Sequence, residues 1–141
     1  MGTVAGGPKP ILYATIRQDK FKVFGPIRFM VDTGSQWTVI SEKDWRRWRV
    51  SFSKLGKPKS FTGLGGCTTL GYPMKNVIIR VRDEGGALIT FIMPNVYFLE
   101  TPKKKREVSA FPSIIGVDFL IQNNLALYFD PKNKRAYFES I

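Results

Sequence analysis

Short apolar runs and alternating apolar positions, bounded by glycine, proline or polar residues, run through most of this chain. Segments of this kind are typical of half-buried strands rather than of long helices. The pattern predicts strands at residues 11–16, 21–24, 27–31, 36–40, 77–82, 87–93, 95–99, 114–116, 125–129 and 135–138. Turns are expected at 25–26, 83–86 and 130–134, and one or two short helices complete an all-β chain.

The two helices are expected after Ser41 and over Asp118–Asn124. Ser41 can cap the first helix, and Asp44 three residues later approximates a capping box. Trp45 and Trp48 then share one face. Packing of both rings against the sheet is the favoured interpretation, and an aromatic surface for nucleic-acid stacking is the alternative.

Composition fits a single globular domain of 141 residues, with 43% hydrophobic and 23% charged residues. The Gly- and Pro-rich residues 1–10 are expected to form a flexible tail, and residues 11–141 the domain. The single cysteine, Cys67, allows no intramolecular disulfide, and no stretch reaches the ~20 apolar residues of a membrane span. We therefore expect a cytoplasmic protein without a membrane partner.

The absence of histidine narrows the chemistry that this chain can perform. It removes Ser-His and Cys-His nucleophilic catalysis and histidine zinc sites. Carboxylates remain as the acid–base groups that suit hydrolysis.

One carboxylate stands out because it follows a buried strand on a tight loop. The apolar run 29–31 leads into Asp32-Thr33-Gly34, and the apolar pair 39–40 follows. The chain contains no second Asp-Thr-Gly or Asp-Ser-Gly triplet. An aspartic peptidase needs two carboxylates, so a peptidase built from this chain must be a homodimer with its active site on the twofold axis.

Such a dimer would use the proton shared by two neighbouring carboxylates. One ionised Asp acts as general base on water, and one protonated Asp acts as general acid. Two carboxylates about 3 Å apart cannot both ionise cheaply, so their apparent pKa values separate and belong to the pair. Gly34 lets the loop turn, and the Thr33 hydroxyl can bond across the pair. The alternative is that Asp32 merely closes a turn.

Three segments in order resemble the retroviral-type aspartic peptidases (retropepsins), especially their non-viral cellular members. Residues 31–35 with 38–40 are similar to the catalytic loop, residues 61–66 to the glycine-rich flap, and residues 114–120 to the second family signature. The resemblance implies a retropepsin-like closed barrel, a single-lobe protomer, acting as a homodimeric aspartic endopeptidase on peptide substrates. It implies catalysis by Asp32, loop support from Thr33 and Gly34, and no metal or organic cofactor.

The same resemblance assigns Gly63, Leu64, Gly65 and Gly66 to a mobile flap that binds substrate. Glycine permits close approach of backbone to a ligand, and a flap can bind an extended peptide as an added strand. An ordinary glycine-rich hairpin turn is the alternative. Asp118 also lies in an apolar setting, but it lacks the following Thr/Ser-Gly, so we expect a structural hydrogen bond or a helix cap there.

The net positive charge of the chain raises a competing hypothesis, the binding of a polyanion such as nucleic acid. Twenty-two basic residues against 11 acidic ones give a net charge of +11. Four consecutive basic residues, 103–106, are favoured as a solvated loop over a polyanion-binding or localisation patch. Two rival functions therefore stay open: a non-catalytic peptide-binding or dimerisation module of the same fold, and a less favoured basic nucleic-acid-binding β-domain.

Overall fold

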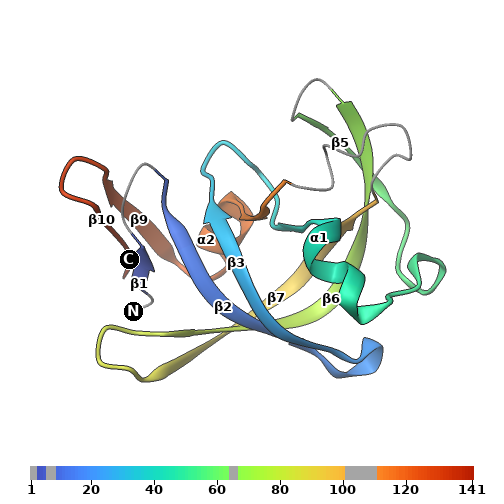
Figure 1. Cartoon of the computed structure of the whole chain (residues 1–141), viewed down its shortest axis with the longest axis horizontal. Coiled ribbons are helices and arrows are strands. Elements are labelled where there is room, and N and C mark those ends of the chain that lie inside the picture. Colours follow the sequence, from blue (N-terminus) through green and yellow to red (C-terminus); the bar gives the residue numbers. More distant parts are fainter. Residues whose placement is uncertain (1–2, 6–8, 64–66, 101–110) are drawn as a thin grey trace.

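The computed structural model describes residues 3–5, 9–63, 67–100 and 111–141 (Figure 1). Ten strands, two α-helices and three 3-10 segments make up this part of the chain. In chain order they are β1 (Thr3–Ala5), β2 (Ile11–Gln18), η1 (Asp19–Phe21), β3 (Val23–Val31), β4 (Val39–Ile40), α1 (Glu42–Trp45), η2 (Arg46–Trp48), η3 (Phe52–Lys54), β5 (Lys59–Gly63), β6 (Cys67–Arg82), β7 (Leu88–Leu99), β8 (Ser113–Ile115), α2 (Val117–Gln122), β9 (Leu125–Asp130) and β10 (Arg135–Ser140). The predicted all-β class with short helices is confirmed.

The strands form one sheet in the order β5-β6-β7-β4-β8-β3-β2-β1-β10-β9, and β6 also pairs with β2. This second pairing joins Thr15 to Arg80 and Arg17 to Ile78. It links β2, β3, β8, β4, β7 and β6 in a ring of hydrogen-bonded neighbours. Strands β1, β9 and β10 extend the sheet beyond this ring, where β10 pairs with both β1 and β9 (Figure 1).

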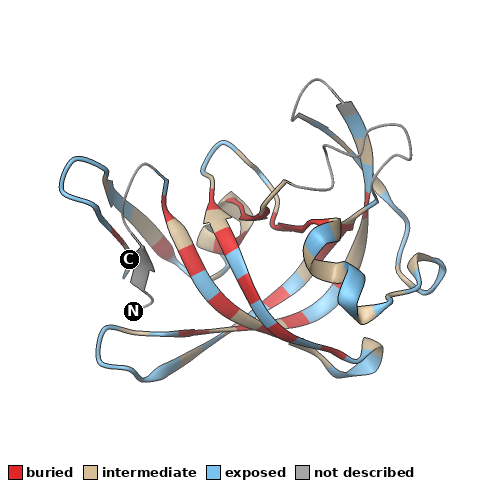
Figure 2. Ribbon diagram, in the orientation of Figure 1, coloured by how far each residue is buried: buried red, intermediate tan, exposed pale blue. Residues whose placement is uncertain are grey.

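Alternating burial along the strands places the core inside this ring. On β2 and β3, buried residues alternate with exposed or half-buried ones along most of each strand (Figure 2). Successive side chains of a strand point to opposite faces, so one face of each strand is apolar and the other is open to solvent. The largest fully buried side chains are Phe29, Phe98, Phe119, Phe138, Leu12, Ile16, Ile40, Met74, Ile79, Met93 and Ile115. Burial of each contributes about 1.5–3 kcal/mol.

Strand β8 lies between the two strands that flank the Asp32 loop. It runs parallel to β3, with Val31 opposite Ile115, and antiparallel to β4, with Val39 opposite Ile114. Residues about 80 positions apart in sequence therefore sit side by side. The loop from Asp32 to Thr38 must cross directly over the end of β8.

Gly116 connects β8 to α2 under this loop, and the backbone there leaves no room for a side chain. A Cβ at Gly116 would lie 2.5 Å from the carbonyl carbon and oxygen of Trp37 and 2.8 Å from the Ser35 oxygen. Real Cβ atoms do not approach backbone this closely, so a larger residue would push the loop away. The sequence predicted a close backbone approach at this glycine, and that prediction is confirmed.

Several predicted strand boundaries were wrong. Gly25-Pro26 does not break β3, because Pro26 sits opposite Thr15 within a continuous antiparallel pair. Pro94 is likewise inside β7, and only Val39–Ile40 of the predicted strand 36–40 is a strand. Proline removes one backbone donor, which is costly only where the sheet needs that donor.

The chain start and the first helix also differ from the sequence prediction. Residues 1–10 were expected to be a flexible tail, whereas Thr3–Ala5 forms β1 and pairs with β10. Backbone pairing of three residues leaves no side-chain pattern to detect. At α1, Ser41 makes no side-chain cap, and the Asp44 carboxylate instead accepts the Ser113 hydroxyl at 2.6 Å. None of the described helices is long and apolar enough to cross a membrane.

Trp45 of α1 and Trp48 of η2 both pack on the sheet, as the favoured interpretation held. Trp45 donates its indole N–H to the Leu99 carbonyl at 2.8 Å and meets the Phe52 ring edge-on at 4.9 Å. Trp48 donates to the Phe24 carbonyl at 3.1 Å, and both rings contact the core. Partly buried indoles with hydrogen-bonded N–H groups thus anchor the α1–η2 segment to β3 and β7.

Gly116→Ala is predicted to lower the free energy of unfolding by about 1–3 kcal/mol, because the new methyl group meets backbone rather than a movable side chain. Denaturant unfolding measures this change. Gly85→Ala is the matched control, since a Cβ there meets only the Asp83 carboxylate at 3.5 Å. Equal stability of the two variants would contradict the tight packing of the loop on Gly116.

Candidate active site

Asp32 lies immediately after β3, and its own backbone and carboxylate fix the turn that follows. Its N–H donates to the Ile115 carbonyl at 3.0 Å, and its carbonyl accepts the Ser35 N–H at 3.0 Å. The Asp32 carboxylate accepts the Gly34 N–H at 2.8 Å. The side chain is half-buried. This carboxylate is therefore held by backbone on the side of the loop and remains reachable from solvent.

Thr33 and Gly34, at the tip of the loop, are exposed. A Cβ at Gly34 would lie 3.1 Å from the Asp32 carboxylate oxygen that accepts the Gly34 N–H. Such a contact is tighter than most side chains tolerate. Glycine at position 34 thus lets the N–H approach the carboxylate closely, as the sequence predicted for the turn.

The rest of the loop is bonded to the start of α2. The N–H groups of Val117 and Asp118 donate to the carbonyls of Ser35 and Gln36 at 2.8 and 3.1 Å. The Ser35 hydroxyl donates to the Trp37 carbonyl at 2.8 Å. Because only Gly116 separates α2 from β8, these bonds fix the loop to the same strand that receives the Asp32 N–H.

Asp118 binds the far end of the loop through both carboxylate oxygens. One accepts the Thr38 hydroxyl at 2.6 Å and the Phe119 N–H at 2.7 Å, and the other accepts the Thr38 N–H at 3.0 Å. The buried Thr38 hydroxyl in turn accepts the Gly116 N–H at 3.1 Å. The predicted structural role of Asp118 is confirmed. The Asp118 carboxylate accepts three hydrogen bonds. This agrees with a structural role and not with a role as a second catalytic Asp beside Asp32 in the same chain.

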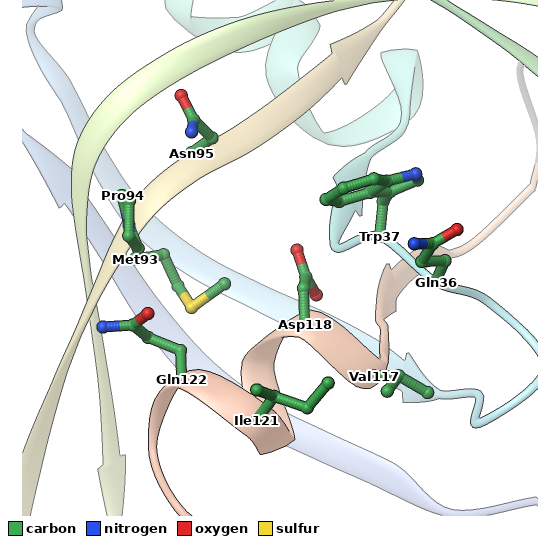
Figure 3. A pocket seen from close by; sticks show the side chains of 9 residues that line it. All are labelled: Gln36, Trp37, Met93, Pro94, Asn95, Val117, Asp118, Ile121 and Gln122. Atoms are coloured by element: carbon green, nitrogen blue, oxygen red, sulfur yellow. The ribbon is translucent and has the colours of Figure 1, made fainter.

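A hollow of about 330 Å³ lies beside Asp118, on the outer side of the loop (Figure 3). Its walls come from the Asp32 loop, from β7 and from α2, whose side chains converge on one space in Figure 3. The lining residues are Gln36, Trp37, Met93, Pro94, Asn95, Val117, Asp118, Ile121 and Gln122. Ile121 is 72% exposed, so the hollow has an apolar, solvent-facing rim.

An aromatic cluster joins the loop to β5, and the sequence analysis did not find it. Trp37 and Phe61 each meet the Tyr97 ring edge-on, at 5.7 and 5.2 Å. The Lys59 ammonium lies 3.6 Å from the centre of the Trp37 ring, a cation–π contact. These residues come from three separate segments, so no local spacing linked them; Trp37 within the loop was the available signal.

The predicted glycine-rich flap corresponds to the β5–β6 hairpin. These strands pair antiparallel from Lys59 opposite Gly71 to Gly63 opposite Cys67. Leu64, Gly65 and Gly66 lie outside the described residues, as does the basic run 103–106. The predicted substrate-binding roles of Gly63 and of residues 64–66 stay predictions.

Among the described residues, no three His, Cys, Asp or Glu side chains gather in a way that could hold a metal ion. At the loop, the Asp32 carboxylate has hydroxyls and backbone N–H groups around it.

Comparison with known proteins agrees with this arrangement. Residues 4–119 match the aspartyl protease family. No curated protein shows detectable sequence similarity to the chain. A retropepsin-like aspartic protease from Rickettsia conorii has a similar fold, with a TM-score of 0.55 and 15% identity over 96% of this chain and 86% of that one.

The retroviral protease-like domain of Ddi1 from Leishmania major is also similar, with a TM-score of 0.50 and 17% identity over 93% of this chain and 90% of that one. At these identities the structural likeness shows the fold alone. The family match covers far more than half of the 141 residues and includes the Asp32 loop, β8 and the first residues of α2. This chain belongs to the aspartyl protease family and has the retropepsin-like fold.

Proposed function

We propose that this protein is an aspartic endopeptidase that acts as a homodimer, with Asp32 of each subunit in one shared active site. The observation that carries the proposal is the single Asp-Thr-Gly loop, held at both ends by β8 and α2 while its tip faces solvent. An enzyme of this kind needs two carboxylates within hydrogen-bond reach. One loop per chain supplies one of them.

The exposure of the loop tip supports docking of a second copy there. Thr33 and Gly34 are exposed and Asp32 is half-buried, so a twofold-related loop can approach without unfolding anything. A twofold interface places identical residues opposite each other. The Thr33 hydroxyls would then bond across the interface, and the two Asp32 carboxylates would share one proton.

Hydrolysis then follows from the two protonation states. The ionised Asp32 takes a proton from water, whose oxygen forms a bond to the scissile carbonyl carbon. The protonated carboxyl group, Asp32 of the partner subunit, donates its proton to the carbonyl oxygen. The first Asp32 then passes the proton it took from water to the amide nitrogen. The C–N bond breaks to release the amine, and one hydroxyl of the intermediate returns its proton to the partner carboxylate as the carboxylic acid forms. The Gly34 N–H donates to one oxygen of the Asp32 carboxylate and helps to hold it in place.

The β5–β6 hairpin and the aromatic cluster would complete the substrate site. An extended peptide lying between the hairpin and the loop would bind main-chain groups as an added strand. Trp37 and Phe61, which both pack against the buried Tyr97 ring, offer apolar surface beside this path, and Lys59 adds a positive charge. We infer that the hairpin closes over the bound peptide and excludes water.

Asp32→Asn is predicted to lower kcat/KM for a peptide mixture by at least about 100-fold, because the amide can neither accept nor donate the catalytic proton. Mass spectrometry of the products between about pH 4 and 7 measures the loss, within the range where carboxylates of a dyad titrate. Asp19→Asn is the control, since Asp19 is exposed and forms an ion pair with Arg17 alone among the residues that the structure describes. Undiminished cleavage by Asp32→Asn would remove Asp32 from the mechanism.

Mixing tests the shared site. Wild type mixed with an equal amount of Asp32→Asn, at constant total protein, should retain about a quarter of the activity of undiluted wild type, since only one dimer in about four then carries two carboxylates. Independent monomers would retain about half. A dimer without any cleavage would instead favour a peptide-binding module with the same fold.

A further inference from the structure

The outward side of β2, β3 and β6 carries a surface that the proposed peptidase chemistry does not use. Cross-strand pairing puts Tyr13 opposite Arg28, Arg17 opposite Phe24, and Arg80 opposite Thr15. The intervening residues of these strands are buried in the core, so all of these side chains share one face. We call this the outer face and define it by Tyr13, Arg17, Phe24, Arg28, Arg80 and Arg82.

Two aromatic rings stand exposed on the outer face. Tyr13 is 64% exposed and Phe24 is 65% exposed. In the described part of the chain, neither ring stacks on another aromatic residue. Large aromatic side chains usually gain stability from burial. Two open rings on a rigid sheet therefore offer stacking surface to something outside the chain.

The outer face is also strongly basic. Of its four arginines, only Arg17 forms an ion pair among the described residues, with Asp19 at 2.8 Å. The hydrogen bond from Arg17 lowers the pKa of Asp19. The other neighbouring acids are Asp83 and Glu84, at the hairpin after β6, where the Asp83 carboxylate accepts the Ala87 N–H at 2.8 Å. A positive surplus remains, in line with the net charge of +11.

A shallow hollow of about 400 Å³ lies within the outer face. Its lining brings guanidinium groups, an aromatic ring and apolar side chains together at one place. Tyr13, Thr15, Pro26, Arg80, Arg82 and Leu88 contribute to it. A flat base needs a ring or an apolar surface to stack on, and the phosphate beside it needs a cation.

The basic and aromatic character continues beyond Phe24. The Arg47 guanidinium lies over the Trp48 ring at 4.3 Å and bonds to the Pro26 carbonyl. Trp48 itself donates to the Phe24 carbonyl. These contacts fix a further cation, Arg47, beside Phe24 at the end of the outer face.

We propose that the outer face binds single-stranded nucleic acid. Exposed aromatic rings beside arginines on a rigid sheet suit a single strand better than a duplex, because a duplex hides its bases. They also suit it better than a lipid surface, because membrane binding needs charge and apolar bulk but no rings for stacking. The outer face includes no residue of the Asp32 loop. Binding of nucleic acid is therefore independent of peptide cleavage.

Fluorescence anisotropy with a labelled single-stranded RNA of about 20 nucleotides tests the proposal. Tyr13→Leu combined with Phe24→Leu keeps apolar bulk and removes the rings; we expect affinity to fall at least about 10-fold. Arg28→Glu combined with Arg82→Glu should make the slope of log affinity against log salt shallower by about 1.4, from two lost phosphate contacts. Lys132→Glu combined with Lys134→Glu, the same change of charge at exposed positions on the β9–β10 turn, should leave affinity within about threefold of wild type.

Asp32→Asn should bind RNA as wild type does, which separates this proposal from the peptidase proposal. Circular dichroism confirms that each variant is folded. Three results would overturn the proposal: no RNA binding by wild type at about 50 mM salt, unchanged binding by the Tyr13/Phe24 variant, or tighter binding to phosphatidylserine vesicles than to RNA. An equal loss of RNA affinity in the Lys132/Lys134 control would also overturn it, because binding would then depend on the net charge of the protein and not on the outer face.

Discussion

The hydrogen bonds between the Asp32 loop and the β8–α2 junction are the constraint on which the rest of the structure depends. The Ile115 carbonyl receives the Asp32 N–H, and Asp118 binds the Thr38 end of the same loop. Gly116 lies beneath the loop, where only a hydrogen in place of a side chain fits. Because β8 is inserted between β3 and β4, the two segments cannot separate without breaking the sheet. A carboxylate held in this way loses little entropy when it binds substrate, which is the condition for acid–base catalysis by positioning.

The way in which the Asp32 loop is held also explains which part of it stays open to solvent. The hydrogen bonds that hold the two ends of the loop run to β8 and α2, and its tip, Thr33 and Gly34, faces solvent. The β5–β6 hairpin, by contrast, is held to the rest of the sheet through β6 and β7 and by the Phe61–Tyr97 contact. A fixed carboxylate beside a hairpin suits a site that must open for a peptide and close around it. The outer face of β2, β3 and β6, with its arginines and exposed aromatic rings, is available for a separate partner.

The sequence predicted the class of fold, most strands, the close backbone approach at Gly116 and the structural role of Asp118, because each leaves a local signal: an apolar run ending in a turn, a glycine, or a lone carboxylate in an apolar setting. It failed where backbone pairing alone decides the outcome. Pro26 and Pro94 were misjudged as breaks because sequence does not reveal which backbone donors the sheet leaves unused. The cluster of Trp37, Lys59 and Tyr97, and the pairing that assembles the outer face, depend on contacts between distant strands, which no local spacing encodes.

Trapping the loop tips against each other tests the central claim most directly. In a background that carries Cys67→Ser, the thiols introduced by Thr33→Cys should form a disulfide between subunits under mild oxidation, because such a bond needs Cα atoms closer than about 7 Å. Thr90→Cys, at an exposed position on β7, should not cross-link. Gel electrophoresis without reductant separates the two outcomes. A covalent dimer that forms only with Thr33→Cys is the result predicted by a shared Asp32 site. If the Thr33→Cys variant stays monomeric while wild type cleaves peptides through Asp32, the central claim is contradicted.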